Sequence, residues 1–236
     1  MNTSNKQTIV SETTAELQMQ VAVAAAELIR EAVNSRGIAN VSLSGGSTPR
    51  RIYELLAEED LPWNHIHWFW GDERNVTPDS DQSNERMVRE TLLKDSRTPE
   101  NQIHPVTVEV EQPAKGARAY EETLREHFQG SDAPQWDLIL LGLGDDAHTA
   151  SLFPGTTALH ENQRWFIENW VEKLDTFRYT LTAPAINSGK NIWFLVAGES
   201  KQDALRNVWG KTGDPSDYPS QLICPTRWYI TRDAQP

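Results

Sequence analysis

The chain alternates between short apolar runs and longer stretches with helical periodicity, and this alternation limits the possible folds more than any other feature. The clearest apolar runs are "NVSL", "IHWFW", "DLILL" and "IWFLV", and each is followed by turn-forming or charged residues. Continuous apolar strands separated by helices indicate a mostly parallel sheet that is covered on both faces. The sequence therefore predicts an α/β fold of three layers, with helices on both faces of a twisted sheet.

Helical periodicity is clearest near the start of the chain. Thr13 and Glu16 have the spacing of a capping box, and apolar residues follow at helical steps until Gly37 ends the pattern. A second helix is predicted after "SGGST", with Pro49 near its first position, where the missing N–H costs nothing. Further helices are predicted in "SNERMVRETLLK", "PAKGARAYEETLREHF" and "SKQDALRNVW", a strand and a short helix in "RYTLTAPAINSG", and a last strand in "TRWYITRD".

Composition excludes several classes of protein. The single cysteine, Cys224, has no partner in the chain for a disulfide, and no signal segment is recognisable, so we expect a cytoplasmic protein. No apolar run approaches the roughly 18 to 20 residues that span a bilayer. A net charge of −12 repels nucleic-acid phosphates. We expect a single domain over residues 1–236, monomeric or weakly homodimeric, that binds neither membrane nor nucleic acid.

The first of four informative strand ends has the composition of an anion-binding turn. Two glycines let the backbone approach a ligand, hydroxyls donate hydrogen bonds, and the following helix presents free N–H groups with a partial positive charge. The spacing G-x-x-x-x-G-K-[ST] of a nucleoside triphosphate loop is absent. An ordinary N-cap turn is the alternative. We predict a phosphate site at Ser44, Gly45, Gly46, Ser47 and Thr48.

The second strand end is the charged cluster that follows "HWFW". Asp72, Glu73 and Arg74 are costly to bury unless they pair or meet a substrate, and an ion-pair network explains them equally well. On the same strand, His65 and His67 are two residues apart, which predicts that they share a face. Two imidazoles without a third ligand at a useful spacing are weak support for a metal, so we expect none.

The third strand end, "LGLGDDAHTASLFPG", has the spacing of a dinucleotide-binding turn at Gly142, Gly144 and Ala147. Such a turn points N–H groups at two phosphates, which Asp145 and Asp146 would repel. The two acids are better explained as partners of His148, because a carboxylate on one imidazole nitrogen fixes the tautomer of the ring. This interpretation places His148 and Asp146 among the candidate catalytic residues.

Two cations near the strands of the last third of the chain form the fourth group. Arg178 and Lys201 are each a candidate second contact for a phosphate, and each can equally be a solvated surface charge. Their positions in the sequence leave both alternatives open.

Together these segments resemble a known family. The stretches "LSGGSTPR", "WFWGDERNVTPDSDQSNERM", "LLGLGDDAHTASLFPG", "RYTLTAPAIN" and "WFLVAGESKQDAL" resemble, in the same order, the 6-phosphogluconolactonase branch of the glucosamine-6-phosphate isomerase/6-phosphogluconolactonase superfamily. The resemblance covers nearly the whole chain. It implies a modified Rossmann-like (NagB-like) fold and the hydrolysis of 6-phospho-D-glucono-1,5-lactone to 6-phospho-D-gluconate in the oxidative pentose phosphate pathway, without metal or cofactor.

The resemblance also implies roles for individual residues. Residues that match the family's phosphate contacts are Gly45, Gly46, Ser47, Thr48, Arg178 and Lys201. Asp72 and Arg74 match the acid and the arginine of its G-D-E-R motif, and His148 matches the histidine taken as general base. The family usually has glycine directly before that histidine, where this chain has Ala147. We expect a negative φ there, because a positive φ costs an alanine about 1 kcal/mol.

Other functions remain open. The amino-sugar-phosphate deaminase/isomerase branch resembles "D-G-H-I-A-F-N-E-P", with a catalytic glutamate where this chain has Phe153, and it has tyrosine where this chain has Arg74. A non-catalytic sugar-phosphate sensor would need none of Asp72, Arg74 and His148. An enzyme that uses a nicotinamide dinucleotide is the most distant alternative, because of the acids after the third strand.

Overall fold

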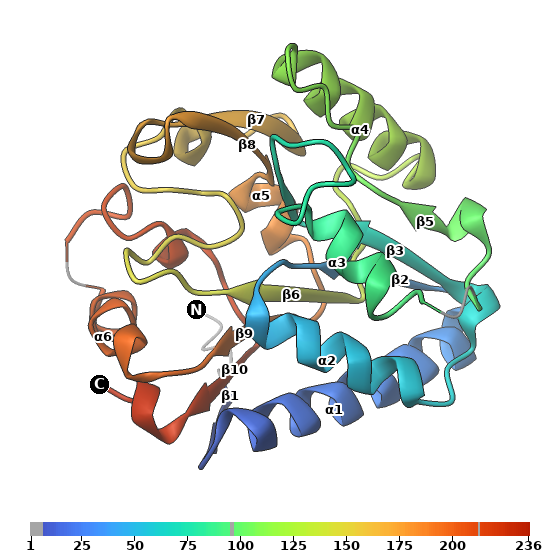
Figure 1. Ribbon diagram of the computed structural model, residues 1–236, viewed down its shortest axis with the longest axis horizontal. Coiled ribbons are helices and arrows are strands. Elements are labelled where there is room, and N and C mark those ends of the chain that lie inside the picture. Colours follow the sequence, from blue (N-terminus) through green and yellow to red (C-terminus); the bar gives the residue numbers. More distant parts are fainter. Residues whose placement is uncertain (1–6, 95–96, 212) are drawn as a thin grey trace.

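Seven parallel strands form a twisted central sheet in the computed structural model, which describes residues 7–94, 97–211 and 213–236 (Figure 1). The strands, in their order across the sheet, are β1 (Gln7–Ser11), β10 (Arg227–Thr231), β9 (Ile192–Val196), β6 (Leu138–Gly142), β2 (Ala39–Leu43), β3 (Ile66–Trp70) and β5 (Ile103–His104). The chain runs outward from β2 through β3 to β5 and then returns to β6 on the other side of β2. This reversal places a topological switch point between β2 and β6, where open α/β sheets bind ligands.

A second, antiparallel sheet was not predicted from the sequence. It consists of β4 (Asp72–Arg74), β8 (Thr176–Leu181) and β7 (Phe166–Val171). Gly71 joins the two sheets, since its N–H donates to Leu43 O (2.8 Å) and its carbonyl accepts from Leu181 N–H (2.8 Å). The strand predicted within "RYTLTAPAINSG" therefore belongs to this second, antiparallel sheet and not to the parallel one.

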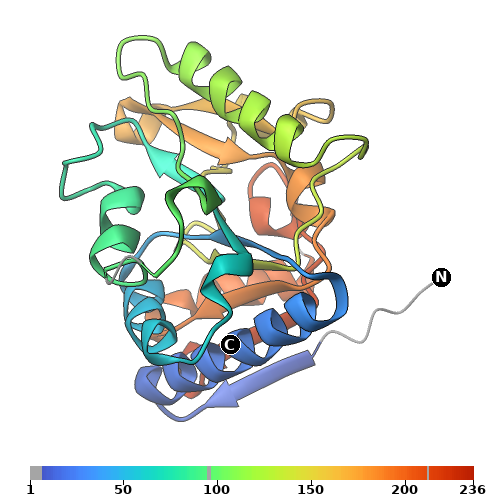
Figure 2. The same cartoon turned by 90° about the vertical axis from the view of Figure 1, so that its right-hand side faces the viewer.

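Helices cover both faces of the main sheet, which confirms the predicted three-layer α/β fold. One face carries α1 (Thr14–Arg36) and α2 (Ser47–Glu58), which pack against each other. Figure 2 shows the second sheet above the other face, with α4 (Pro113–His127) outermost on it. The other helices are α3 (Asn84–Glu90), α5 (Ala183–Asn187) and α6 (Gln202–Gly210). Short 3₁₀ helices occur at Trp63–His65, Glu100–Gln102, Thr157–His160, Glu172–Leu174, Glu199–Lys201, Pro219–Leu222 and Arg232–Ala234.

The first helix begins and ends where the sequence predicts. The Thr13 hydroxyl accepts a hydrogen bond from Glu16 N–H (3.2 Å), and Gly37 ends the helix in the left-handed conformation, with φ of 79°. The helix predicted over "SNERMVRETLLK" is shorter than expected. It ends at Glu90, where the Thr91 hydroxyl donates to Met87 O (2.7 Å).

Buried apolar residues from both sheets and from α1, α2 and α4 form one hydrophobic cluster. The single domain expected from the chain length stays a prediction, although this shared core supports it. Among the described residues, no helix is long and apolar enough to cross a membrane.

The prediction that His65 and His67 share a strand face is wrong. His65 is exposed and ends the 3₁₀ helix that precedes β3, whereas His67 lies inside β3. The strand begins at Ile66, the first residue of the apolar run, so its two-residue alternation does not extend to His65.

Candidate active site

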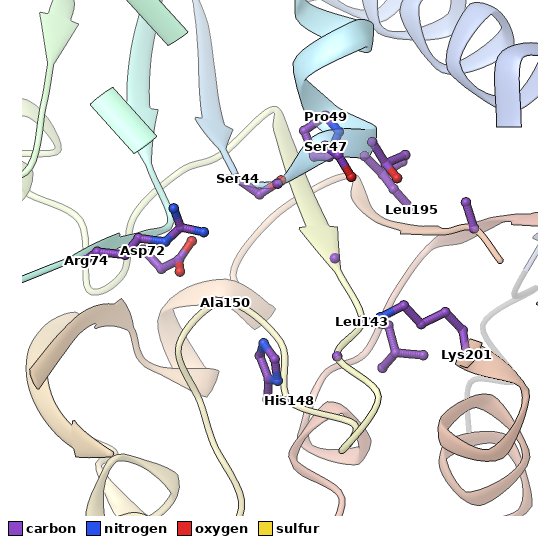
Figure 3. Close-up of a pocket in the computed structure, with 16 residues that line it drawn as sticks. Ser44, Ser47, Pro49, Asp72, Arg74, Leu143, His148, Ala150, Leu195 and Lys201 are labelled. Carbon is purple, nitrogen blue, oxygen red and sulfur yellow. The ribbon is translucent and has the colours of Figure 1, made fainter. Parts of the chain in front are cut away.

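A cavity of about 320 Å³ opens where the carboxyl ends of β2, β3, β6 and β9 converge (Figure 3). It lies at the switch point of the sheet, and its walls come from loops that are far apart in the sequence. The predicted residues that line it are Ser44, Gly45, Gly46, Ser47, Thr48, Asp72, Arg74, His148 and Lys201. The fold therefore brings nine candidate residues to one concave site.

The turn between β2 and α2 forms one wall, and it is built to approach a ligand with its backbone. Gly46 has a φ of 107°, a conformation that favours glycine, and it makes no side-chain cap to α2. A Cβ on Gly45 would lie 1.9 Å from Asn84 Oδ1, so only glycine fits there. The Ser44 hydroxyl is buried beside the cavity without a hydrogen-bond partner among the described residues. Uncapped N–H groups at a helix start and a spare hydroxyl suit an anion.

His148 lies on the opposite wall and is held from two sides. Its Nδ1 is 2.5 Å from Asp146 Oδ1, and its ring stacks on Phe153 with the ring centroids 4.1 Å apart. A carboxylate only accepts hydrogen bonds, so Nδ1 carries the proton and Nε2 keeps its lone pair. Figure 3 shows the ring between the Lys201 side and the Arg74 side of the cavity.

The two aspartates before His148 have different partners, contrary to the prediction that both orient it. Asp146 alone contacts the imidazole, and its other oxygen accepts from Lys173. Asp145 instead pairs with Lys201, 2.5 Å away. Burial disfavours the charge on Asp146, but the hydrogen bonds from His148 and Lys173 prevail and hold the pKa of this carboxyl well below its ordinary value. Asp146 therefore stays ionised beside the imidazole.

The prediction of a negative φ at Ala147 is wrong, since its φ is 60°. Hydrogen bonds fix this conformation: Ala147 N–H donates to Gly144 O (2.9 Å), and the Ala147 carbonyl accepts from Ser220 N–H (3.0 Å) and from its hydroxyl (2.7 Å). Ala150 also has a positive φ, of 48°. Strained residues on both sides of His148 persist because the surrounding contacts determine their conformation.

The glycines after β6 do not form a dinucleotide-binding turn. The chain makes turns from residue 145 onward, and the next helical segment is the 3₁₀ helix Thr157–His160. The chain after Gly144 therefore does not run directly into a helix, as a dinucleotide-binding turn requires. A Cβ on Gly144 would lie 2.0 Å from His148 Nδ1, so this glycine makes room for the imidazole rather than for a pyrophosphate.

The charged cluster after β3 divides into a structural acid and two cavity residues. Glu73 is buried, and its carboxylate accepts hydrogen bonds from the backbone N–H groups of Arg74, Asn84 and Glu85, each at 2.8 Å. It therefore caps the start of α3. Burial raises the pKa of Glu73 although these donors oppose the shift. Asp72 accepts from the Ser151 hydroxyl (2.8 Å), and Arg74 donates to a backbone carbonyl (2.6 Å). No ion pair joins Asp72 to Arg74 in the described part of the chain.

The two candidate cations of the last third occupy different places. Lys201 reaches the cavity from the loop after β9. Arg178 does not line the cavity, because it lies on β8, directly opposite Arg74 in the antiparallel pair. Burial and the neighbouring Arg74 lower the pKa of Arg178. Arg178 is thus a half-buried neighbour of the arginine on the cavity wall.

The sequence analysis did not identify Lys173 as a partner of Asp146, or Phe153 as the residue on which His148 stacks. Lys173 lies 27 residues from its partner Asp146, and its Nζ is 5.4 Å from the centroid of the Phe153 ring. No local pattern marks such a contact. The apolar part of the cavity wall was also missed; its residues include Leu143, Ala150, Leu195 and Ala197.

Comparisons with known proteins identify the family of this chain. Residues 12–231 match the family described as "Glucosamine-6-phosphate isomerases/6-phosphogluconolactonase". A 6-phosphogluconolactonase of Synechocystis sp. is 45% identical over 199 residues, which cover 84% of this chain and 82% of the relative. The structure of a 6-phosphogluconolactonase from Trypanosoma cruzi is 29% identical, with a TM-score of 0.85 over 98% of this chain and 95% of that one.

A monomeric glucosamine-6-phosphate deaminase has the same fold with 21% identity and a TM-score of 0.77, over 97% of this chain and 98% of that one. At this identity the likeness concerns the fold alone. The match to the family over most of the chain, together with the 45% identical relative, determines the assignment. The chain is an enzyme that belongs to the glucosamine-6-phosphate isomerase/6-phosphogluconolactonase family.

Proposed function

We propose that this enzyme hydrolyses 6-phospho-D-glucono-1,5-lactone to 6-phospho-D-gluconate, the lactone-opening step of the oxidative pentose phosphate pathway. The observation that carries the proposal is the position of His148: it lies on the wall opposite the anion-binding turn, with Asp146 on Nδ1 and a lone pair on Nε2. A base on one side of a cavity and an anion site on the other suit a substrate with a reactive carbonyl at one end and a phosphate at the other.

The 6-phosphate binds at the start of α2. Gly45, Gly46, Ser47 and Thr48 offer backbone N–H groups and hydroxyls, and the helix adds a partial positive charge. When the phosphate binds, Lys201 leaves Asp145 and pairs with the phosphate. Arg178, which lies opposite Arg74 on the neighbouring strand, adds to the positive potential. Fixing the phosphate fixes the lactone carbonyl near His148, and such positioning lowers the entropic part of the barrier.

His148 Nε2 then takes a proton from a water molecule, whose oxygen attacks the lactone carbon. The charge that develops on the carbonyl oxygen is stabilised by Arg74, while Asp72 orients the sugar hydroxyls. As the ring C–O bond breaks, the imidazolium returns its proton to the departing ring oxygen. Asp146 stabilises the imidazolium between these two proton transfers. The products are the open-chain carboxylate and one released proton.

The direct test is the rate of acid release from freshly prepared 6-phosphogluconolactone in a pH-stat, corrected for spontaneous ring opening. We expect saturable hydrolysis with this substrate and much slower hydrolysis of gluconolactone without the phosphate. The deaminase alternative predicts ammonia from glucosamine 6-phosphate. We expect none, because Phe153 stands where that branch has its glutamate and stacks on the imidazole. Ammonia release without lactone hydrolysis would contradict the proposal.

Replacing Asp146 with asparagine tests the proposed role of the aspartate. The amide donates to Nδ1 and so favours the tautomer with the proton on Nε2, which cannot act as a base. We expect kcat to fall by about 10²-fold or more with little change in KM, because a histidine in the wrong tautomer no longer contributes as a general base. Asp145→Asn is the matched control. It should affect KM, through Lys201, rather than kcat.

The difference in unfolding free energy between the wild type and Asp146→Asn should depend on pH. The folded pKa of Asp146 lies below its ordinary value of 3.8, so the ionised carboxylate contributes stability that is fully present above about pH 4 and is lost as pH falls through the folded pKa. Urea denaturation of wild type and Asp146→Asn should therefore give a difference in unfolding free energy that shrinks as pH falls below about 4. A difference that grew below about pH 4 would contradict this assignment.

A further inference from the structure

A cluster of three histidines lies outside the candidate active site. His67 on β3, His104 on β5 and His127 at the end of α4 are half-buried, and one ring nitrogen of each lies within 4.8 Å of the other two. His67 Nδ1 and His104 Nε2 are 2.9 Å apart. Half of the six histidines in the chain meet here, from segments that are 23 to 60 residues apart.

We propose that this cluster binds one divalent late transition-metal ion of the Zn²⁺ class. Imidazole nitrogens are ordinary ligands of Zn²⁺, at about 2.0 to 2.1 Å from the metal, which puts tetrahedral nitrogens about 3.3 Å from one another. At 2.9 Å, one of His67 Nδ1 and His104 Nε2 donates its proton to the other. On metal binding this proton must move to the other nitrogen of its own ring, while the two nitrogens separate slightly and His127 approaches. Three protein nitrogens leave the fourth position to water.

The hydrogen bonds around His127 favour a tautomer with one nitrogen free to bind a metal. Its Nε2 is 2.8 Å from Asn40 Oδ1. The Asn40 amide nitrogen donates to Gln135 O (3.3 Å), so Asn40 turns its oxygen toward the imidazole as an acceptor. His127 therefore carries its proton on Nε2 and keeps a lone pair on Nδ1. A ligating histidine commonly donates its other N–H to an oxygen acceptor in this way.

The environment also keeps the imidazoles neutral, which metal ligation requires. Burial, assisted by the neighbouring histidines, lowers the pKa of His104 and of His127 to about 4. Phe69 stacks on His104 with ring centroids 4.4 Å apart, which holds that ring in place. The geometric convergence of three nitrogens carries the proposal, and the neutral state is consistent with it.

The cluster is separate from the candidate active site. None of its residues lines the cavity at the carboxyl ends of the strands. His67 lies near the amino end of β3, five residues before Asp72, and β5 is the edge strand of the sheet (Figure 1). A metal ion here would join the edge strand, its neighbour and α4, and would stabilise the fold without entering the reaction.

The test is titration of metal-free protein with Zn²⁺ by calorimetry, and with Co²⁺ by visible absorption. We expect one site per chain and a Co²⁺ spectrum of four-coordinate intensity. His104→Gln and His127→Gln should each weaken binding by at least about 100-fold, and Asn40→Ser by about 10- to 100-fold. Exposed His160→Gln is the matched control and should bind as the wild type does.

His148→Gln separates this site from the candidate active site, and it should also retain the ion. Zn²⁺ should raise the thermal midpoint of wild type but not of folded His104→Gln, whose lactone hydrolysis should equal that of wild type. If the histidine variants fail to fold, the wild-type Co²⁺ spectrum decides. The proposal would be overturned if the protein bound no metal ion or if the Co²⁺ spectrum were octahedral. It would also be overturned if binding were lost in His148→Gln and kept in His104→Gln. The three histidines would then form only a hydrogen-bonded stack of imidazoles.

Discussion

Replacing His148 with alanine is expected to lower kcat for lactone hydrolysis by about 10²- to 10⁴-fold, the usual contribution of a positioned general base. The variant removes the imidazole whose Nε2 faces the cavity, while the anion-binding turn stays intact. Binding of the product 6-phosphogluconate should therefore change little. Initial rates from a pH-stat, corrected for spontaneous opening, give kcat, and calorimetry gives the affinity for the product.

The control for this variant is His160→Ala, which removes an exposed histidine outside the cavity. It should leave both kcat and product affinity as in wild type. An unchanged kcat in His148→Ala would refute the role of this residue as base. Loss of product binding together with activity would instead indicate that His148 holds the phosphate.

Gly144→Ala is expected to reduce kcat by a similar factor, about 10²-fold or more, without removing any catalytic group. The added Cβ would lie 2.0 Å from His148 Nδ1, 2.2 Å from its Cε1 and 2.8 Å from Asp146 Oδ1. Atoms cannot approach so closely, so the imidazole must leave its position over Asp146. The displaced side chain can rotate, and Gly144 has no positive φ, so the variant should still fold.

Gly142→Ala is the matched control, because a Cβ there meets nothing within 4 Å. It should leave kcat near the wild-type value, and since Gly142 lines the cavity, any effect should be on KM. Circular dichroism and thermal midpoints verify that both variants fold. A folded Gly144→Ala with wild-type kcat would show that the position of His148 is not needed for turnover.

Secondary structure and candidate sites could be predicted where all the interacting groups lie in one short segment of the sequence. The apolar runs and helical periods predicted five of the seven parallel strands, β2, β3, β6, β9 and β10, and α1 with its cap at Thr13 and its end at Gly37. They did not predict β1 and β5. The turn at residues 44–48 was predicted as an anion site because strand, glycines and helix start are contiguous. Repulsion between adjacent acids and a pyrophosphate was enough to reject a dinucleotide turn.

Contacts between distant segments were not predictable in this way. β4 has only three residues, and "FIENWV" lacks a continuous apolar run, so the second sheet left no strong pattern in the sequence. Two consecutive aspartates look equivalent in sequence, yet only the fold gives Asp146 to His148 and Asp145 to Lys201. The positive φ at Ala147 likewise depends on Ser220, 73 residues later.

The sequence by itself determined the α/β class and the set of candidate side chains, including the turn at residues 44–48, because these follow from local periodicity and residue type. Only the tertiary structure decided which aspartate orients His148, why Gly144 must lack a side chain, and that His67 meets two histidines from other elements. Hydrogen bonds and steric limits act over a few ångströms in space, and the distance between residues along the chain does not reveal them.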